Sequence, residues 1–233
     1  MKYLPQGLSD ILKRFMRNRY RQSLSGKTVE QVFTAIYERG VWGTKDNKSG
    51  GGSTTEQTRE IIQELPKLFQ RYKIRSVLDL PCGDFTWMQQ VDLSSITYIG
   101  GDIVESIINE NTARFPSKNK HFQKLDIISD ELPRVDLLLC RDCFIHLSQA
   151  HILQSLENIL RSEIKYLLVT SFTDTPTNVD IITGEWRRVN MELAPFQLQP
   201  IAVINERCTV DDGKFADKSL LLIDLKEHRE RRA

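Results

Sequence analysis

Short apolar segments alternate with helix-like segments from residue 76 to residue 172, and this rhythm constrains the fold more than any other feature. The apolar segments predict strands at residues 76–80, 98–101, 135–140 and 166–172, and helical periodicity covers residues 103–115 and 149–160. Strands that alternate with helices predict a parallel sheet covered on both faces, because a crossover must return the chain before the next parallel strand can pair. We therefore expect a doubly wound α/β fold.

Two further strands are predicted near the end of the chain, at residues 201–208 and 220–225. They flank the turn Asp211-Asp212-Gly213, and Asp-Gly between apolar runs is a hairpin signal. The mostly parallel sheet is therefore expected to end in an antiparallel hairpin.

The composition is that of one globular domain. Hydrophobic residues make up 40% of the 233 residues and charged residues 27%, which excludes a disordered or fibrous chain. No uncharged apolar run is long enough to span a membrane, and charge interrupts the first twenty residues, so we expect a cytoplasmic protein. The 32 Lys and Arg residues balance 31 Asp and Glu residues, so overall charge gives no argument for a nucleic-acid partner.

Residues 1–70 predict a helical extension, and residues 71–233 the main domain. Residues 1–27 predict a short amphipathic helix, which can lie on anionic lipid, grip an anionic substrate or pack on the domain, packing being its commonest fate. Its apolar residues are Leu8, Ile11, Leu12, Phe15 and Met16, and its basic residues are Lys2, Lys13, Arg14, Arg17, Arg19, Arg21 and Lys27. A second helix is expected at residues 28–39.

A glycine-rich loop at residues 49–53 precedes the third predicted helix. Ser53, with Glu56 three residues later, forms a capping box that predicts a helix at residues 54–69. A glycine-rich loop that leads into a helix N-terminus can also cradle an anion.

Acidic residues follow the first two predicted strands. Asp79 ends the first strand, and Asp102 ends the second, where an acid can hold the two hydroxyls of a ribose. Pro81 lacks an N–H and Phe85 blocks the third glycine position of the dinucleotide fingerprint, so a pyrophosphate fits badly. Asp79 suits a ligand with an ammonium group instead, and S-adenosylmethionine carries a ribose, an adenine and an ammonium but no phosphate.

The segment 77–85 resembles the first motif of class I S-adenosylmethionine-dependent methyltransferases. Asp102 is similar to their ribose-binding acid, Asp126 to their adenine-side acid, and segment 136–146 to their fourth-strand motif. Pro81 stands where the family has glycine. The resemblance implies a seven-stranded sheet, S-adenosylmethionine as cofactor, and residues 1–70 as a lid over cofactor and substrate. The expected cofactor site comprises Asp79, Pro81, Cys82, Gly83, Asp102, Ile103, Asp126, Ile127, Arg141, Trp42 and Ser53.

Residues 141–146 follow the fourth predicted strand, where this architecture brings a substrate close to the donated methyl. The sulfonium already makes that methyl electrophilic, so the protein must align the acceptor and, for a hydroxyl, remove its proton. His146 is the candidate base, and Asp142 can orient it or the substrate. The alternative interpretation is that His146 only packs over the cofactor.

The four cysteines are expected to be reduced and buried, without disulfides. Cys140 and Cys143 have Cys-x-x-Cys spacing, and Cys82 is expected nearby on the neighbouring strand. A metal or redox site is conceivable, but buried thiols without chemistry are the favoured interpretation, and we expect no metal.

The acceptor pocket is expected to draw on the N-terminal segment around Trp42 and on the long segment 172–196. The latter contains hydrogen-bonding and planar groups that suit a sugar or another polar small molecule, although a solvated loop anchored by one Trp is an equally good interpretation. The candidate acceptor-binding residues are Phe172, Trp186, Arg187 and Asn190. No aromatic run interleaved with basic residues marks a base-stacking track, so no nucleic-acid partner is expected.

These patterns predict an S-adenosylmethionine-dependent methyltransferase that acts on a polar small molecule or glycan, by O-methylation. A non-catalytic S-adenosylmethionine-binding or scaffold protein on the same fold is the alternative, because fold alone does not separate the two. A nicotinamide-dependent oxidoreductase is disfavoured by Pro81 and Phe85.

Overall fold

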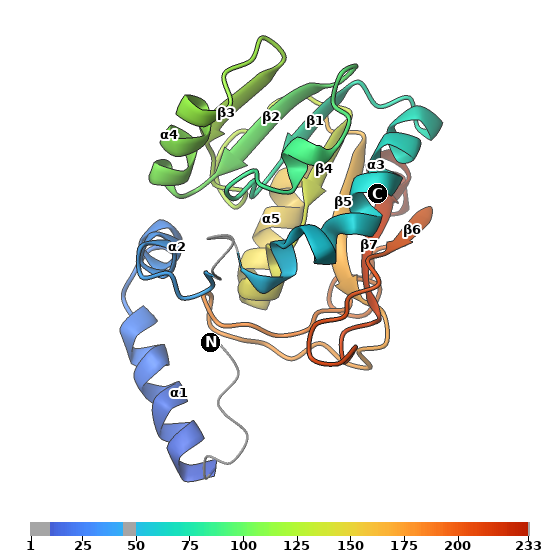
Figure 1. Ribbon diagram of the computed structural model, residues 1–233. Helices are drawn as coiled ribbons and strands as arrows, with labels where there is room; N and C mark the ends of the chain where they lie inside the picture. Colours follow the sequence, from blue (N-terminus) through green and yellow to red (C-terminus); the bar gives the residue numbers. More distant parts are fainter. Residues whose placement is uncertain (1–9, 44–49, 233) are drawn as a thin grey trace.

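The computed structural model describes residues 10–43 and 50–232, which form one seven-stranded mixed sheet with helices on both faces (Figure 1). The strand order is β3-β2-β1-β4-β5-β7-β6, with parallel pairs from β3 to β5 and with β7 antiparallel to β5 and β6. The strands are β1 (Ser76–Asp79), β2 (Thr97–Asp102), β3 (Lys120–Lys124), β4 (Leu137–Cys140), β5 (Tyr166–Phe172), β6 (Ala202–Asn205) and β7 (Lys218–Asp224). The predicted doubly wound sheet with its C-terminal hairpin is confirmed.

Both faces of the sheet are buried, as β4 illustrates. Leu137 and Leu139 join the apolar core under α3, whereas Leu138 and Cys140 join the core under α5. Side chains of a strand alternate between its two faces, so a strand with a helix layer on each side needs an unbroken apolar run. The helices are α1 (Asp10–Leu24), α2 (Val29–Glu38), α3 (Thr55–Arg71), α4 (Glu105–Arg114), α5 (Gln149–Arg161) and α6 (Leu225–Arg232).

Two helix starts show how local sequence sets the element bounds. Thr28 and Gln31 form a reciprocal capping box at the start of α2. The predicted cap of α3 is wrong by one residue: Thr54 is the N-cap and accepts from the Gln57 N–H at 3.4 Å, while Ser53 belongs to the preceding 3₁₀ turn, Gly51–Ser53.

Two elements have no counterpart among the segments assigned from the sequence. β3 is an edge strand whose residues are mostly exposed, so it lacks the apolar run by which the other strands are found. α6 is almost wholly polar after Leu225 and therefore lacks helical periodicity of apolar residues. No helix in the described ranges is long and apolar enough to cross a membrane.

The segment between β5 and β6, residues 173–201, contains neither helix nor strand, yet much of it is buried. Side-chain amides satisfy its backbone. Asn190 donates from Nδ2 to the carbonyls of Thr173 and Thr175, both at 3.1 Å, and Asn178 donates to the carbonyl of Asn190 at 2.8 Å. A buried backbone outside regular structure needs such partners, so these polar residues hold the segment in shape.

The helices α1 and α2 lie beside the sheet rather than on either of its faces (Figure 1). α2 reaches the β3 and α4 side, where Glu30 pairs with Lys124 at 2.6 Å and Tyr37 donates to Glu110 at 3.3 Å. Gly184 lies against the same helix, since a Cβ there would approach Val32 Cγ1 to 2.6 Å.

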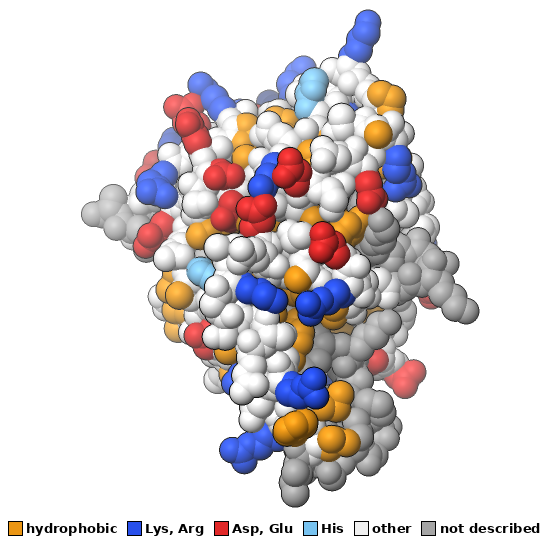
Figure 2. Space-filling model, turned by 90° about the vertical axis from the view of Figure 1, so that its left-hand side faces the viewer, with side chains coloured by type: hydrophobic (Ala, Val, Ile, Leu, Met, Phe, Trp, Pro, Cys, Tyr) orange, Lys and Arg blue, Asp and Glu red, His pale blue; other side chains and the backbone are white. Residues whose placement is uncertain are grey.

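α1 docks by its polar side, contrary to the favoured expectation that its apolar stripe packs on the domain. Tyr20 donates to the Gly184 carbonyl at 2.7 Å, and Arg17 and Arg21 pair with Glu185. The apolar side chains Leu12, Phe15 and Met16 are exposed, and Figure 2 shows apolar and basic side chains gathered together on this side of the molecule. Residues 1–9 of the predicted helix lie outside the described residues.

Candidate functional site

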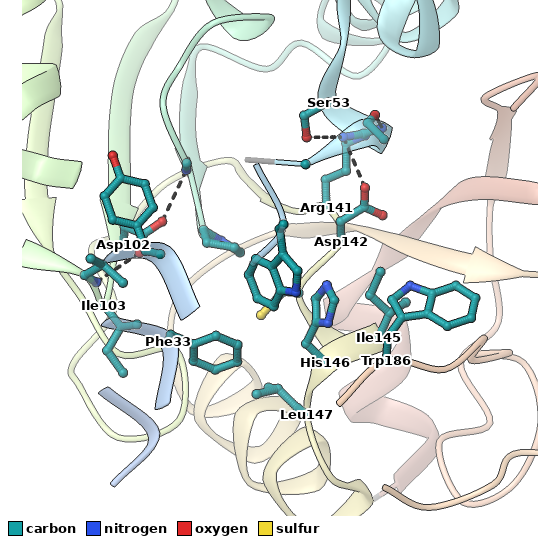
Figure 3. Close-up of a pocket in the computed structure, with 18 of the residues that line it drawn as sticks. Phe33, Ser53, Asp102, Ile103, Arg141, Asp142, Ile145, His146, Leu147 and Trp186 are labelled. Carbon is teal, nitrogen blue, oxygen red and sulfur yellow. Dashed lines mark hydrogen bonds and ion pairs between the residues drawn. The ribbon is translucent and has the colours of Figure 1, made fainter. Parts of the chain in front are cut away.

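One cavity of about 930 Å³ lies at the carboxyl ends of the parallel strands (Figure 3). Its floor is formed by the residues that follow β1, β2, β3 and β4, and α1, α2 and the Gly51–Ser53 turn supply the opposite wall. All the site residues expected from the sequence line this cavity, except Arg187 and Asn190.

Asp102 ends β2 and closes one end of the cavity. Its carboxylate accepts from the Val104 N–H at 3.0 Å and from the Gly83 N–H at 3.2 Å, which ties the loops after β1 and β2 together. Burial raises the pKa of Asp102 to about 6, although these backbone N–H groups lower it in part. Beside it, Ile103 lines the same end of the cavity.

Asp79 ends β1 and is almost fully buried. The Tyr98 hydroxyl donates to its carboxylate at 2.7 Å. Burial raises the pKa of Asp79 to about 7, against the lowering effects of Tyr98 and Arg141, and the neighbouring Asp102 raises it further. A buried acid with a pKa near neutrality favours a cationic ligand, because a positive charge beside it would stabilise the carboxylate form.

The loop after β1 approaches the cavity through its backbone. Gly83 has φ of +54°, a conformation that glycine adopts without strain, and its carbonyl accepts from Asn111 Nδ2 at 2.7 Å. The peptide bond before Pro81 is cis, and the Cys82 N–H donates to the Gly101 carbonyl at 2.7 Å. A Cβ at Gly101 would approach the Leu80 side chain to 2.9 Å, so a larger residue there would displace that side chain.

Asp126 lies after β3, next to Ile127 on the cavity wall. Its carboxylate accepts from the Ile128 N–H at 2.9 Å and from the Ser129 hydroxyl at 3.1 Å, so it also shapes its own turn. These bonds leave carboxylate lone pairs that a ligand amino group can use.

Four charged side chains form a buried cluster between β4 and the hairpin strands. Arg141 donates from Nη2 to Glu206 at 2.7 Å, and Lys218 contacts both Glu206 at 3.1 Å and Asp142 at 2.7 Å. Arg141 also donates to the Gly52 carbonyl at 2.8 Å. The cluster therefore fastens the glycine-rich turn to the edge of the sheet, where Arg141, Asp142 and Lys218 line the cavity.

Asp142 is held ionised by this cluster. Burial alone would raise its pKa, but Arg141 and Lys218 lower the pKa of Asp142 to about 2. Asp142 is therefore ionised near neutral pH, as the charged partner of Arg141 and Lys218.

His146 stands at the opposite end of the cavity from Asp102 (Figure 3). Its Nδ1 lies 3.0 Å from the Glu185 carbonyl, and a carbonyl only accepts, so Nδ1 carries the proton and Nε2 keeps its lone pair. Burial lowers the pKa of His146 to about 4, and the imidazole is therefore neutral near pH 7. The Trp42 ring stacks on it with centroids 4.2 Å apart.

Aromatic side chains surround this end of the cavity. Phe172, Trp186 and Phe215 meet edge to face, with ring centroids 5.4 to 6.2 Å apart. Arg187, by contrast, donates to the carbonyls of Phe144 and Leu147, and Asn190 braces the 173–201 segment. Both bind backbone carbonyls and neither lines the cavity, to which the 173–201 segment contributes Glu185 and Trp186.

Solved structures with this architecture include methyltransferases. The human N-acetylserotonin methyltransferase complex with SAM has a TM-score of 0.53 and 16% identity over 85% of this chain, which spans 60% of that enzyme's length. The N-methyltransferase NodS from Bradyrhizobium japonicum WM9, in complex with S-adenosyl-l-homocysteine, has a TM-score of 0.60 and 14% identity over 82% of this chain and 97% of its own. The structure of PigF with SAH has a TM-score of 0.63 and 14% identity, over 91% of this chain and 68% of the PigF chain.

The chain has the class I methyltransferase fold. No protein-family model matches it, and no curated protein matches its sequence.

Several residues that line the site of this methyltransferase fold were not expected from the sequence. They are Phe33, Tyr37, Glu185, Cys208, Phe215 and Lys218. A signal existed for the charged cluster, since Glu206 interrupts one predicted strand and Lys218 just precedes the other, and buried charges of this kind need partners. Nothing in the local sequence marks Phe33 or Phe215, which read as ordinary core residues.

The cysteines are free thiols. Cys82 and Cys140 are buried, and burial raises the pKa of both well above its ordinary value. In the described part of the chain, no group of three or more His, Cys, Asp or Glu side chains is placed to hold a metal ion.

Proposed function

We propose that this protein is an S-adenosylmethionine-dependent methyltransferase that methylates a hydroxyl group of a small acceptor. The observation that carries the proposal is a single cavity with two strand-end carboxylates at one end and a neutral histidine at the other. The first end suits a cationic nucleoside, and the second suits removal of a hydroxyl proton.

The cofactor end fits S-adenosylmethionine residue by residue. Asp102 would accept the ribose hydroxyls, and Asp79 would face the ammonium group of the methionyl part, whose charge favours its ionised form. Asp126 and Ile127 would receive the adenine, the former by a hydrogen bond from its amino group. Gly83 lets the backbone come close, because no side chain stands between it and the cavity.

The remaining cofactor contacts come from both sides of the cavity. Ile103, Pro81 and Cys82 supply apolar surface around the ribose, and Trp42, Ser53 and Arg141 close the site from the side of the glycine-rich turn. The bound cofactor supplies an electrophilic methyl group, so the protein has to align the acceptor and manage one proton.

His146 would take that proton. Its Nε2 keeps the lone pair of a neutral imidazole whose tautomer the Glu185 carbonyl sets, and Asp142 raises the pKa of the ring against the lowering by burial. Asp142 is the nearby negative charge that would stabilise the imidazolium formed in the transfer, because the two groups interact electrostatically.

The acceptor is inferred to have a planar, apolar body that carries the hydroxyl. Phe172, Trp186 and Phe215 offer ring edges and faces at the His146 end, while Arg187 and Asn190 are occupied with backbone carbonyls. This inference differs from the polar small molecule or glycan expected from the sequence, and it rests on the aromatic side chains at this end of the cavity.

The test is isothermal titration of the purified protein with S-adenosylhomocysteine, the demethylated product, because it requires no knowledge of the acceptor. Binding in the micromolar range is expected, and NADH titrated under the same conditions should give no heat. Absence of S-adenosylhomocysteine binding would overturn the proposal. Hydroxylated aromatic compounds and simple sugars can then be compared as acceptors with methyl-labelled cofactor, and transfer to sugars alone would overturn the inferred acceptor class.

A further inference from the structure

Trp42 brings an unsatisfied hydrogen-bond donor to the candidate base. Its ring stacks on His146 and packs against Phe33, with ring centroids 5.9 Å apart in the second pair. Its Nε1 is buried and has no hydrogen-bond partner. An indole N–H can only donate, and burying it without an acceptor is unfavourable. A ligand atom with a lone pair would relieve that cost.

We propose that the Trp42 N–H binds the oxygen atom of the methyl acceptor and thereby makes the site selective for hydroxyl over amine acceptors. This inference rests on the proposed function. The N–H donor of Trp42 and the Nε2 lone pair of His146 belong to two rings in contact, and both residues line the cavity. Together they offer one donor and one acceptor to the reacting group.

A hydroxyl group satisfies both partners while it reacts. Its proton goes to His146 Nε2, and one oxygen lone pair forms the new bond to the methyl carbon. The carbon–sulfur bond breaks with its electron pair left on sulfur. The second oxygen lone pair remains free throughout, and it can accept from the Trp42 N–H, which also stabilises the charge that develops on oxygen.

An amine cannot satisfy both partners. A neutral amine nitrogen has a single lone pair, and that lone pair must attack the methyl carbon. The Trp42 N–H would then face another N–H and stay without an acceptor in a buried site. A site built to hydrogen-bond one group discriminates strongly against an analogue that leaves its polar atoms unpaired.

The experiment uses two probes of the same shape, para-nitrophenol and para-nitroaniline, titrated into the full chain saturated with S-adenosylhomocysteine. The indole N–H signals of ¹⁵N-labelled protein are followed by NMR. The chain has three Trp residues, so Trp42→Phe, Trp87→Phe and Trp186→Phe assign the three signals. Trp42→Phe is also the decisive variant, since it keeps a smaller aromatic ring and removes the donor, and para-nitroaniline binding reports the effect of the smaller ring alone.

We expect para-nitrophenol, and not para-nitroaniline, to shift the Trp42 signal downfield. Trp42→Phe should weaken para-nitrophenol binding by roughly tenfold to a hundredfold, as for one hydrogen bond to a charged oxygen, and leave para-nitroaniline binding unchanged. Trp42→Leu, which also removes the stack, should in addition lower the affinity for both probes.

Three results would overturn the assignment. The Trp42 signal could shift fully with S-adenosylhomocysteine alone, which would give the N–H to the cofactor. Trp42→Phe could change the affinity for both probes equally. Alternatively, para-nitrophenol could fail to bind the protein saturated with S-adenosylhomocysteine. A failure of S-adenosylhomocysteine itself to bind would instead overturn the proposed function, so the two failures are distinguishable.

Discussion

The two ends of the cavity are assembled in different ways. At the cofactor end, the contacts join residues close in sequence: Asp79 and Asp102 meet partners 19 residues away, and Gly83 meets Asn111 at a separation of 28. At the acceptor end, Tyr20 and Arg21 meet residues 184 and 185 at a separation of 164, and in the cluster between the two ends Arg141 meets Glu206 at a separation of 65. The cofactor end is thus built by neighbouring strand–helix units, whereas the acceptor end exists only once distant segments have come together.

The largest expected effect comes from breaking the cluster that joins the two ends. Glu206→Ala removes the carboxylate between Arg141 and Lys218 and leaves these two buried cations to share Asp142, which should lower the free energy of unfolding by about 3 to 5 kcal/mol. Urea denaturation measures it. Glu227→Ala, which breaks an exposed pair with Arg231 on α6, is the control and should cost less than about 1 kcal/mol. Equal losses in the two variants would contradict a structural role for the cluster.

Replacing His146 should reduce methyl transfer without reducing cofactor affinity. His146→Gln keeps a polar side chain but cannot take a proton, so turnover should fall by roughly a hundredfold or more. The affinity for S-adenosylhomocysteine should stay within about twofold, because the cofactor carboxylates are untouched. Methyl transfer and calorimetry on the same preparation measure both. Full turnover would reduce His146 to a packing residue.

Cofactor affinity should depend on pH through Asp79 and Asp102. Their pKa values are raised to about 7 and about 6 in the free protein. The ammonium group of the ligand favours ionised Asp79, and the ribose hydroxyls, as donors, favour ionised Asp102. Binding of S-adenosylhomocysteine should therefore release protons and strengthen by roughly a hundredfold between pH 5 and pH 8. Calorimetry in buffers of different ionisation enthalpy counts the protons released.

The stability of the free protein changes with pH in the opposite direction to the cofactor affinity. A carboxyl whose pKa is higher in the folded than in the unfolded state stabilises the fold below the unfolded pKa, and this contribution disappears as the pH rises through 6 to 7. Thermal melts should show a stabilisation by S-adenosylhomocysteine that grows over the same range. A pH-independent affinity would remove both carboxylates from the site.

Asp102→Ala should have an intermediate effect confined to the cofactor end. The ribose hydroxyls would lose their acceptor, and the loss in binding free energy should be about 1 to 3 kcal/mol by calorimetry with S-adenosylhomocysteine. Ser117→Ala, a hydroxyl on the surface turn before β3, is the control and should leave the affinity unchanged. An Asp102→Ala protein with wild-type affinity would contradict the assigned role.

The smallest effect is expected at the docking of α1. Glu185→Gln weakens two ion pairs whose arginine partners are 52% and 36% exposed, so the loss of stability should stay below about 1 kcal/mol. Cleavage within α1 by a protease should nevertheless become faster at low salt, because the ion pairs tie the helix to Glu185. The difference from the wild type should shrink at high salt, which screens those pairs in the wild type. An unchanged cleavage rate would show that Tyr20 alone secures α1.

The fold and the cofactor end could be predicted because their signals are local. A buried strand is recognisable from a few consecutive apolar residues. Parallel strands bring their carboxyl ends to one edge of the sheet, so the sequence predicts that Asp79, Asp102 and Asp126 lie together. The edge strand β3 could not be predicted, because its mostly exposed residues do not form an apolar run. The cap of α3 was missed by a single residue because Ser53 and Thr54 carry the same kind of hydroxyl.

The acceptor end could not be derived in this way, and the physical reason is the distance along the chain. Arg187 and Asn190 resemble ligand-binding residues in sequence, but tertiary packing directs them to backbone carbonyls that no helix or strand satisfies. Phe33, Trp42 and Phe215 come from three separate segments and meet His146 or its neighbours only in the folded chain. The sequence by itself determined the mostly parallel sheet with its C-terminal hairpin and the carboxylates that follow its strands at one end of the cavity. Tertiary structure decided which side chains face the acceptor, because that choice depends on contacts between residues far apart in sequence.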